Sequence, residues 1–169
     1  MKTYTISDLH GYPVDKFKAL LDKANFSDTD TLYILGDVID RNGDGGVSLL
    51  RYIMAQPNFG FILGNHEDML LKSRLVIEER TEAGKALGIE YFESLSEYSC
   101  WMLNGGGVTL EHLRDLSEED PGAVKEVFDY LNNSPHIAAL TVNGRSTQNA
   151  AHRPETGLKR SWSGSWAMR

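Results

Sequence analysis

The sequence lacks several features that would assign it to a common class of protein. Cys100 is its single cysteine, which excludes an intrachain disulfide and a cysteine-rich zinc site. The first residues have no apolar core of the kind found in signal peptides, and no segment is apolar over a length that spans a bilayer. We therefore expect a cytoplasmic protein with no membrane partner.

Positive charge is also scarce, because 17 Lys and Arg stand against 24 Asp and Glu, giving a formal net charge of -7. Broad nucleic-acid binding requires a basic face that neutralises phosphates, so we expect no nucleic-acid partner. A small anionic substrate would need local positive charge from metal ions and a few arginines. The length of 169 residues is that of one domain with a good core.

Three short polar clusters follow apolar, strand-like runs in the amino-terminal part of the chain. The clusters are Ser-Asp-Leu-His-Gly at 7–11, Gly-Asp-Val-Ile-Asp-Arg at 36–41 and Gly-Asn-His-Glu at 64–67, and the runs before them are 4–6, 32–35 and 59–63. Successive clusters lie roughly 30 residues apart, the length of one strand–helix–strand crossover. Helical periodicity over 14–21 and 47–55 supplies the crossover helices.

Right-handed crossovers make the strands parallel and bring their C-terminal ends to one edge of the sheet. We therefore expect six polar side chains to converge in one cleft: Asp8, His10, Asp37, Asp40, Asn65 and His66. Carboxylate, amide and imidazole groups gathered in this way predict a metal site with two ions. The fold class predicted is α/β, with helices packed on a sheet.

The remainder of the chain is expected to continue with helices and then change character. A helical stripe covers 67–80, and 83–107 is interpreted as an insertion that caps the cleft. Further helices are expected at 109–116 and 124–131, followed by a strand at 137–142 and a turn. The predicted domain therefore covers 1–145, and 146–169 is expected to be a divergent polar tail.

The proposed donors also have ordinary interpretations. Asp8 and His10 stand two residues apart at a strand end and suit Mn, Fe or Zn better than Ca, yet they could equally be a solvated turn residue and an incidental histidine. Asp37 could bridge two cations, which repel unless an anion lies between them, or cap a helix. His152 could be a ligand or a tail residue.

The residues around these donors suggest acid catalysis and phosphate binding. Arg41 could hold phosphate oxygens through its planar guanidinium. Asn65 would be a weak ligand, and His66 could protonate a leaving oxygen while Asp40 orients the imidazole. The alternative is an Asn cap with a surface His that begins a helix. Trp101 is interpreted as a packing residue.

Together the three clusters resemble the calcineurin-like metallophosphoesterases. The resemblance is to their phosphoprotein-phosphatase branch, with its bacterial and phage serine/threonine phosphatases and diadenosine-tetraphosphate hydrolases. It is strong over roughly the first 70 residues, and the Trp101–Thr109 stretch is similar to a "W…NGG…T" stretch of the bacterial members. The family fold implies a β-sandwich flanked by helices.

By position, the resemblance implies a role for each site residue. The implied ligands are Asp8 and His10 for the first metal, Asp37 for both metals and Asn65 for the second. His66 would be the proton donor paired with Asp40, and Arg41 would bind phosphate together with Asn65. The implied cofactors are two divalent ions, with Mn favoured over Fe or Zn, and a metal-activated water would attack phosphorus in line.

The C-terminal part departs from the family pattern. The family completes its second metal site with two later histidines, whereas here His152 falls about one residue out of register and no later Gly-His pair exists. We therefore expect a truncated or divergent end after Arg145. The predicted activity is hydrolysis of a phosphomonoester, with a phosphorylated protein or a small phosphoester as substrate. The alternatives are a dinucleoside-polyphosphate hydrolase and an inactive binding module.

Overall fold

The computed structural model describes residues 1–79, 89–142 and 145–150. Within those ranges no helix combines the length and the hydropathy needed to traverse a bilayer. The prediction for His152 lies outside the described residues.

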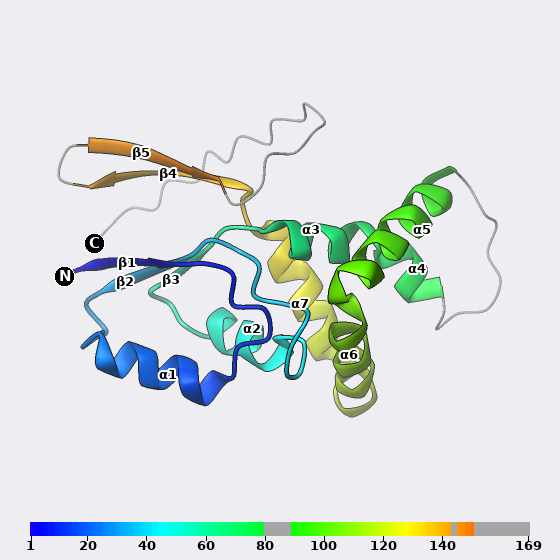
Figure 1. The fold of residues 1–169 in the computed structure, drawn as a ribbon, viewed down its shortest axis with the longest axis horizontal. Coiled ribbons are helices and arrows are strands. Elements are labelled where there is room, and N and C mark those ends of the chain that lie inside the picture. Colours follow the sequence, from blue (N-terminus) through cyan, green and yellow to red (C-terminus); the bar gives the residue numbers. More distant parts are fainter. Residues whose placement is uncertain (80–88, 143–144, 151–169) are drawn as a thin grey trace.

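A three-stranded parallel sheet forms the amino-terminal part of the fold (Figure 1). Its strands are β1 (Thr3–Ile6), β2 (Thr31–Ile34) and β3 (Phe59–Phe61), in that order. Helices α1 (Val14–Lys23) and α2 (Val47–Met54) connect them. Tyr4 pairs with Leu32, which pairs with Phe59. The predicted parallel strands and crossover helices are confirmed.

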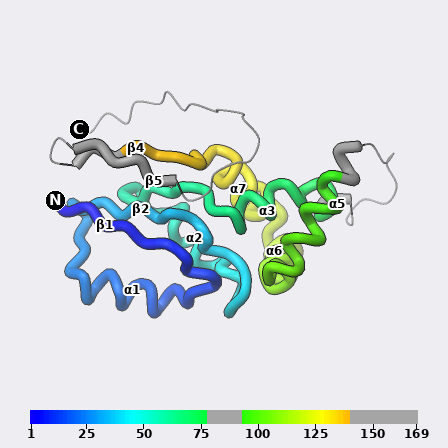
Figure 2. Tube along the Cα trace, turned by 45° about the horizontal axis from the view of Figure 1, so that its top comes forward, coloured from blue at the N-terminus to red at the C-terminus, as the bar shows by residue number. Residues whose placement is uncertain are grey.

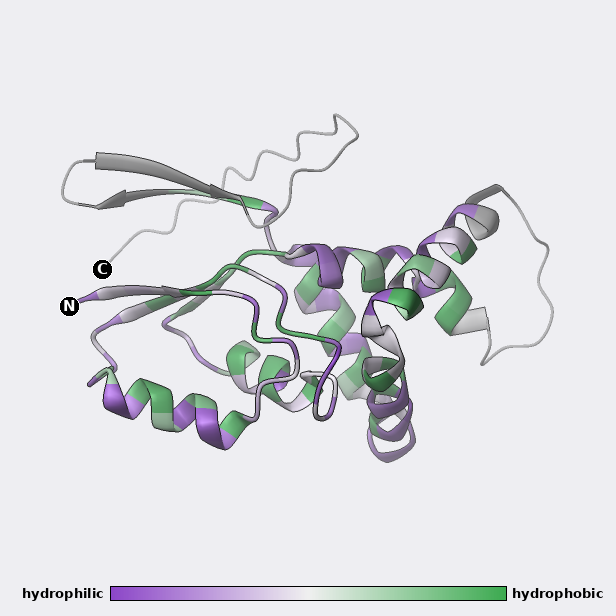
Figure 3. Ribbon diagram, viewed as in Figure 1, coloured by the Kyte–Doolittle hydropathy of each residue, from purple (hydrophilic) through white to green (hydrophobic). Residues whose placement is uncertain are grey.

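The two crossover helices cover one face of this sheet, as Figures 1 and 2 both show. Leu32 and Ile34 of β2 are buried, and Phe17 of α1 is fully buried against the core that they share. Figure 3 shows hydrophobic residues along β2, β3 and α2, whereas the last turns of α6 are hydrophilic. Burial of the apolar face therefore fixes how the strands and helices pack.

Beyond the sheet the chain forms a group of helices at the C-terminal ends of the strands (Figure 1). They are α3 (Asn65–Lys72), α4 (Arg74–Glu79), α5 (Ile89–Trp101), the π-helix η1 (Met102–Gly106), α6 (Gly107–Glu119) and α7 (Pro121–Asn133). The helices predicted at 109–116 and 124–131 lie within α6 and α7. Asp120 caps α7 by accepting from the Gly122 and Ala123 amides.

The helix predicted over 67–80 is interrupted, which the apolar periodicity did not indicate. The chain breaks at Ser73, where α3 ends and α4 begins. The Ser73 hydroxyl donates to the Met69 carbonyl at 2.6 Å, and the side chain is fully buried. The Met69 carbonyl also accepts the Ser73 amide at 3.0 Å, so the hydroxyl shares an acceptor with the helical backbone, an arrangement that often bends helices.

A second, two-stranded sheet follows α7. Strands β4 (Ile137–Val142) and β5 (Arg145–Ala150) are antiparallel, with Ile137 opposite Ala150. The Leu63 amide donates to the Pro135 carbonyl at 2.8 Å, which links the segment after β3 to the start of this hairpin. Of the expected polar tail, 146–150 therefore forms a strand. Within the described residues these two strands form the second sheet, and the β-sandwich implied by the resemblance stays a prediction.

The loop after β2 approaches the loop after β3 so closely that Gly36 has no room for a side chain. Its φ is 76°, and a Cβ at this position would meet the backbone of Gly64 at 2.2 Å. Gly107, by contrast, has a helical φ of -57° and nothing within 4 Å of the place where a Cβ would lie.

Gly36→Ala is expected to lower the free energy of unfolding by about 3 kcal/mol, because it combines a left-handed φ with a backbone clash. Gly107→Ala is the matched control and is expected to raise stability by up to about 1 kcal/mol, since Ala is the better helix former. Urea denaturation followed by circular dichroism measures both. Equal stability of the two variants would show that the loops do not approach as described.

Candidate metal centre

Left-handed backbone geometry is concentrated at the predicted site. Within the described ranges six residues other than glycine have a positive φ. Asn25 lies away from the predicted clusters, and the other five are Asp8 (56°), His10 (38°), Asp37 (55°), Asp40 (76°) and Arg41 (72°). Each such conformation is uncommon and costs on the order of 1 kcal/mol or more, so the surrounding structure must enforce it.

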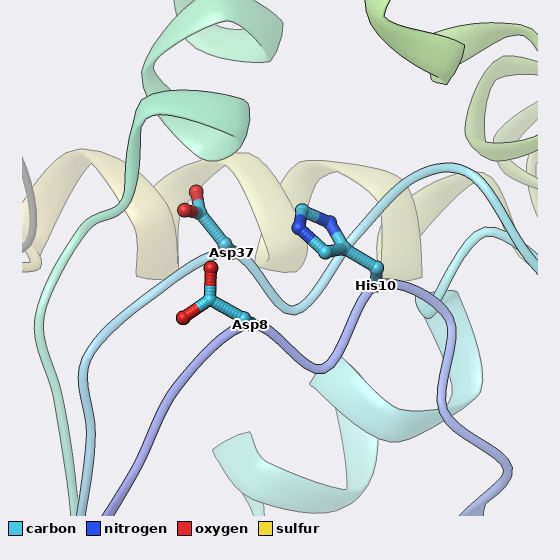
Figure 4. A group of neighbouring side chains, drawn as sticks. All are labelled: Asp8, His10 and Asp37. Atoms are coloured by element: carbon cyan, nitrogen blue, oxygen red, sulfur yellow. The ribbon is translucent and has the colours of Figure 1, made fainter.

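Asp8, His10 and Asp37 lie together where β1 and β2 end, and Figure 4 shows their side chains gathered between the two loops. One ligand atom from each of them lies within 4.8 Å of the others. The loop after β1 is attached to the loop after β2 by the His10 amide, which donates to the Asp37 carbonyl at 2.9 Å. The convergence predicted for these three residues is confirmed.

A hydrogen bond orients the His10 ring for ligation. Its Nδ1 lies 3.1 Å from the Ile39 carbonyl oxygen, which can only accept, so Nδ1 carries the proton and donates. Nε2 is left with a free lone pair, the form in which imidazole binds metals. Two carboxylates and one neutral imidazole are a donor set that suits a divalent transition metal. The residues present therefore fit an ion.

The Glu67 carboxylate holds the loop after β2 against α3. It is fully buried and accepts four backbone amides, from Asp37 (2.9 Å), Val38 (2.8 Å), Ile39 (3.2 Å) and Gly64 (3.0 Å). The pKa of this carboxyl is raised above its usual value, because desolvation and the charge of Asp37 outweigh the lowering effect of the hydrogen bonds from the Asp37, Val38 and Ile39 amides. Glu67 was not predicted to have a role in the site, although its position three residues after Gly64 matches half of a capping box.

Asp37 also faces the first turn of α3. Its Oδ1 accepts the His66 amide at 3.1 Å, so a carboxylate lies at the positive end of the helix. The side-chain amide of Asn65 adjoins the Asp37 carboxylate. When the side-chain nitrogen of Asn65 faces Asp37, it donates to Oδ2 and Oδ1 at 3.1 and 3.2 Å. Turned by half a rotation, Asn65 presents its oxygen, the atom able to ligate a metal.

Asp40 and His66 form a buried pair beside this centre. Asp40 Oδ2 lies 2.7 Å from His66 Nδ1, and both residues are at most 1% exposed. The same carboxylate accepts from Trp101 Nε1 at 2.8 Å and from the Thr109 hydroxyl at 2.5 Å. Trp101, which we interpreted as a packing residue, is thus buried and also hydrogen-bonded to the site. Thr109 was not identified as a site residue from the sequence.

Arg41 fixes the tautomer of His66. Its Nη2 lies 3.0 Å from His66 Nε2, and a guanidinium can only donate, so Nε2 accepts and Nδ1–H points to Asp40. The rings of His66 and His10 meet edge to face with centroids 4.6 Å apart. The phosphate-binding candidate Arg41, the acid candidate His66 and the metal-ligand candidate His10 therefore adjoin one another. Their roles stay predictions.

The fold and the site define an α/β protein with a candidate metal centre at the C-terminal edge of its parallel sheet and a buried Asp–His pair beside it. The sequence model of one family, described as calcineurin-like phosphoesterase, matches residues 1–164. The chain belongs to this family, whose members depend on divalent metal ions.

Curated relatives match part of the chain. Symmetrical bis(5'-nucleosyl)-tetraphosphatases from Salmonella typhi and from Salmonella paratyphi B (strain ATCC BAA-1250 / SPB7) are each 44% identical over 73 residues. The matched stretch is 42% of this chain and 25% of each relative. The match therefore spans about a quarter of the length of these relatives.

Glu67→Gln tests the four backbone hydrogen bonds by which the Glu67 carboxylate holds the loop that contains Asp37. A Gln amide would turn its NH₂ towards two backbone N–H donors, so we expect stability to fall by about 3 kcal/mol in urea denaturation with a chelator present. Glu111→Gln, at an exposed position of α6, is expected to stay within about 0.5 kcal/mol of wild type. A stable Glu67→Gln protein would contradict the ionised, four-fold hydrogen-bonded carboxylate, because Gln resembles a protonated Glu.

Proposed function

We propose that the chain hydrolyses phosphomonoesters in a metal-dependent reaction, with a serine/threonine phosphoprotein as the first candidate substrate. The observation that carries this proposal is the His66–Asp40 hydrogen bond of 2.7 Å next to the donor set of Asp8, His10 and Asp37. An acid–base pair beside a metal centre is the combination that phosphoester hydrolysis requires.

In this proposal each residue of the centre has a defined task. Asp8 and the free Nε2 of His10 would hold one ion, and Asp37 would be shared with a second ion that Asn65 also contacts. His152 stays a predicted further ligand. Divalent ions bound there would supply Lewis-acid stabilisation of the phosphoryl oxygens and lower the pKa of a bound water.

His66 and Arg41 would act on the two sides of the scissile bond. As the attacking water oxygen bonds to phosphorus in line, the bond from phosphorus to the leaving oxygen breaks. For His66 Nε2 to give a proton to that oxygen, the ring must first be protonated at Nε2, which displaces Arg41 Nη2 from its contact there. Asp40 would stabilise this imidazolium through Nδ1–H until the proton is transferred and the ring is neutral again. Arg41 is exposed and carries N–H donors beyond the Nη2 that contacts His66, so it can reach phosphate oxygens.

A hollow of about 280 Å³ includes Gly11, the residue after His10, in its lining. It is lined by Gly11, Pro13, Val14, Asp15, Gly43, Asp44 and Ser48. These described residues include two carboxylates and no cation. A leaving group that extends along this hollow would meet negative charge, which disfavours a polyphosphate and suits a neutral or basic peptide, and a phosphoprotein is therefore placed first.

Hydrolysis of a dinucleoside polyphosphate is the second candidate. The tetraphosphatases named above support it through their 44% identity over 73 residues. A third possibility, a phosphate- or protein-binding module without turnover, follows from the family's two late histidines. The described residues contain neither of them.

The experiment that tests the function is a comparison of three substrates with the full chain and Mn²⁺. Release of phosphate from an aryl phosphate and from a phosphoserine peptide, faster than cleavage of diadenosine tetraphosphate, is expected. Preferential cleavage of diadenosine tetraphosphate would establish the second candidate. Binding of phosphate or Mn²⁺ without turnover of any substrate would identify the binding module.

His66→Asn is expected to lower kcat about 10²- to 10⁴-fold on a phosphoserine peptide, because the leaving alkoxide loses its proton donor. Metal content, measured by mass spectrometry after gel filtration, should stay near that of wild type. His112→Asn is the matched control, since His112 lies on α6 and donates to the Val108 carbonyl of its own helix. Loss of metal in the His66 variant would make His66 a ligand and refute its assignment as the acid.

A further inference from the structure

The Asp40 carboxylate has two hydrogen-bond donors besides His66, and both come from distant parts of the chain. Trp101, the last residue of α5, is 61 positions away and donates to Oδ2. Thr109, in the first turn of α6, is 69 positions away and donates to Oδ1. Asp40, Trp101 and Thr109 are each 0% exposed, so solvent does not compete for these bonds.

Thr109 contacts Asp40 at two points. Its hydroxyl oxygen accepts the Asp40 amide at 3.1 Å. Its one hydroxyl hydrogen has two acceptors in reach, Asp40 Oδ1 at 2.5 Å and the Gly45 carbonyl at 3.1 Å, and the shorter contact favours donation to Oδ1. The Asp40 amide also donates to the Gly45 carbonyl at 2.9 Å, so the backbone does not depend on Thr109 alone. The contact that only Thr109 supplies is therefore the one to the carboxylate.

The connection between α5 and α6 is built close to the site. Gly105 of η1 has a φ of 99°, and its carbonyl accepts the amide of Arg41 at 3.1 Å. A Cβ on Gly106 would meet the Trp101 indole ring, and a Cβ on Gly45 would meet Thr109. The close packing of Gly106 against Trp101 and of Gly45 against Thr109 fixes the positions of the indole N–H and the hydroxyl relative to Asp40.

A carboxylate held by one donor can rotate about its χ2 torsion, which is broad for Asp. With donors on both oxygens the plane of the carboxylate is fixed, and with it the direction in which Oδ2 meets His66 Nδ1–H. Buried donors also stabilise the charge that Asp40 needs in order to stabilise an imidazolium.

We propose that Trp101 and Thr109 are positioning residues for proton donation by His66, acting through Asp40. The inference rests on the proposed function and extends it. The helical segment α5–η1–α6 supports proton donation by His66 and also covers the core. Neither residue touches the reacting atoms.

The dependence of kcat/KM on the leaving group shows whether Thr109 and Trp101 position the proton donor or only support the structure. A leaving group such as 2,4-dinitrophenolate departs without a proton, whereas phenolate or a serine alkoxide needs one. Thr109→Val keeps the shape and removes the donor, so kcat/KM should fall at least tenfold on phenyl phosphate and a phosphoserine peptide, and less than threefold on 2,4-dinitrophenyl phosphate. Thr109→Ser retains the hydroxyl and should restore all three rates. Trp101→Phe should reproduce the pattern of Thr109→Val.

A second measurement needs no turnover. The Nδ1–H proton of His66, observed by ¹H–¹⁵N NMR at fixed pH, should move upfield and exchange faster in Thr109→Val and Trp101→Phe, and match wild type in Thr109→Ser. If wild type hydrolyses none of the substrates, the proposed function fails, and this signal still decides the inference.

Three results would overturn the inference. The first is an unchanged Nδ1–H signal in both Thr109→Val and Trp101→Phe. The second is an equal loss of rate on all leaving groups. The third is failure of both variants to fold, as judged by circular dichroism, which would leave the two residues with a structural role alone.

Discussion

The arrangement of the whole site depends on the buried Glu67 carboxylate, which accepts hydrogen bonds from four backbone amides. Three of these amides are consecutive, at 37–39, and the fourth belongs to Gly64. A buried carboxylate is stable only if such donors surround it, and the donors are satisfied only if the loops stay in place. This one group therefore sets the positions of Asp37, Asn65 and His66 relative to one another.

The same constraint explains how the chain tolerates unfavourable backbone conformations. Asp8, His10, Asp37, Asp40 and Arg41 all have a positive φ, which their side chains alone would not select. The amides and carbonyls of these loops bind each other, as in the bonds from His10 to Asp37 and from Gly11 to Val38. Backbone strain at the centre is thus offset by hydrogen bonds around it, and the donors gain a fixed geometry.

Sequence patterns predicted the part of the fold that depends on period and spacing. Apolar, strand-like runs located β1 to β3, and the equal spacing of the polar clusters placed Asp8, His10 and Asp37 at one edge. The break at Ser73 was not predicted, because a serine hydroxyl that bonds to its own helix leaves no periodic signal. The strand after Arg145 was also missed, since 146–150 lacks an apolar pattern.

The site was predicted less completely than the sheet. Glu67 lies within a recognised cluster, yet its inward direction depends on how tightly the loops after β2 and β3 approach. The contacts of Trp101 and Thr109 with Asp40 span more than sixty residues and depend on the close packing at Gly45 and Gly106. No local pattern encodes such contacts. Only the similarity of the Trp101–Thr109 stretch to bacterial phosphatases pointed to this segment.

The most direct test of the account is to locate an ion in crystals of the full chain soaked with Mn²⁺, by anomalous diffraction. We expect a strong anomalous peak in direct coordination with the carboxylates of Asp8 and Asp37 and with His10 Nε2. An ion bound elsewhere, with these three side chains free of it at saturating Mn²⁺, would contradict the central claim.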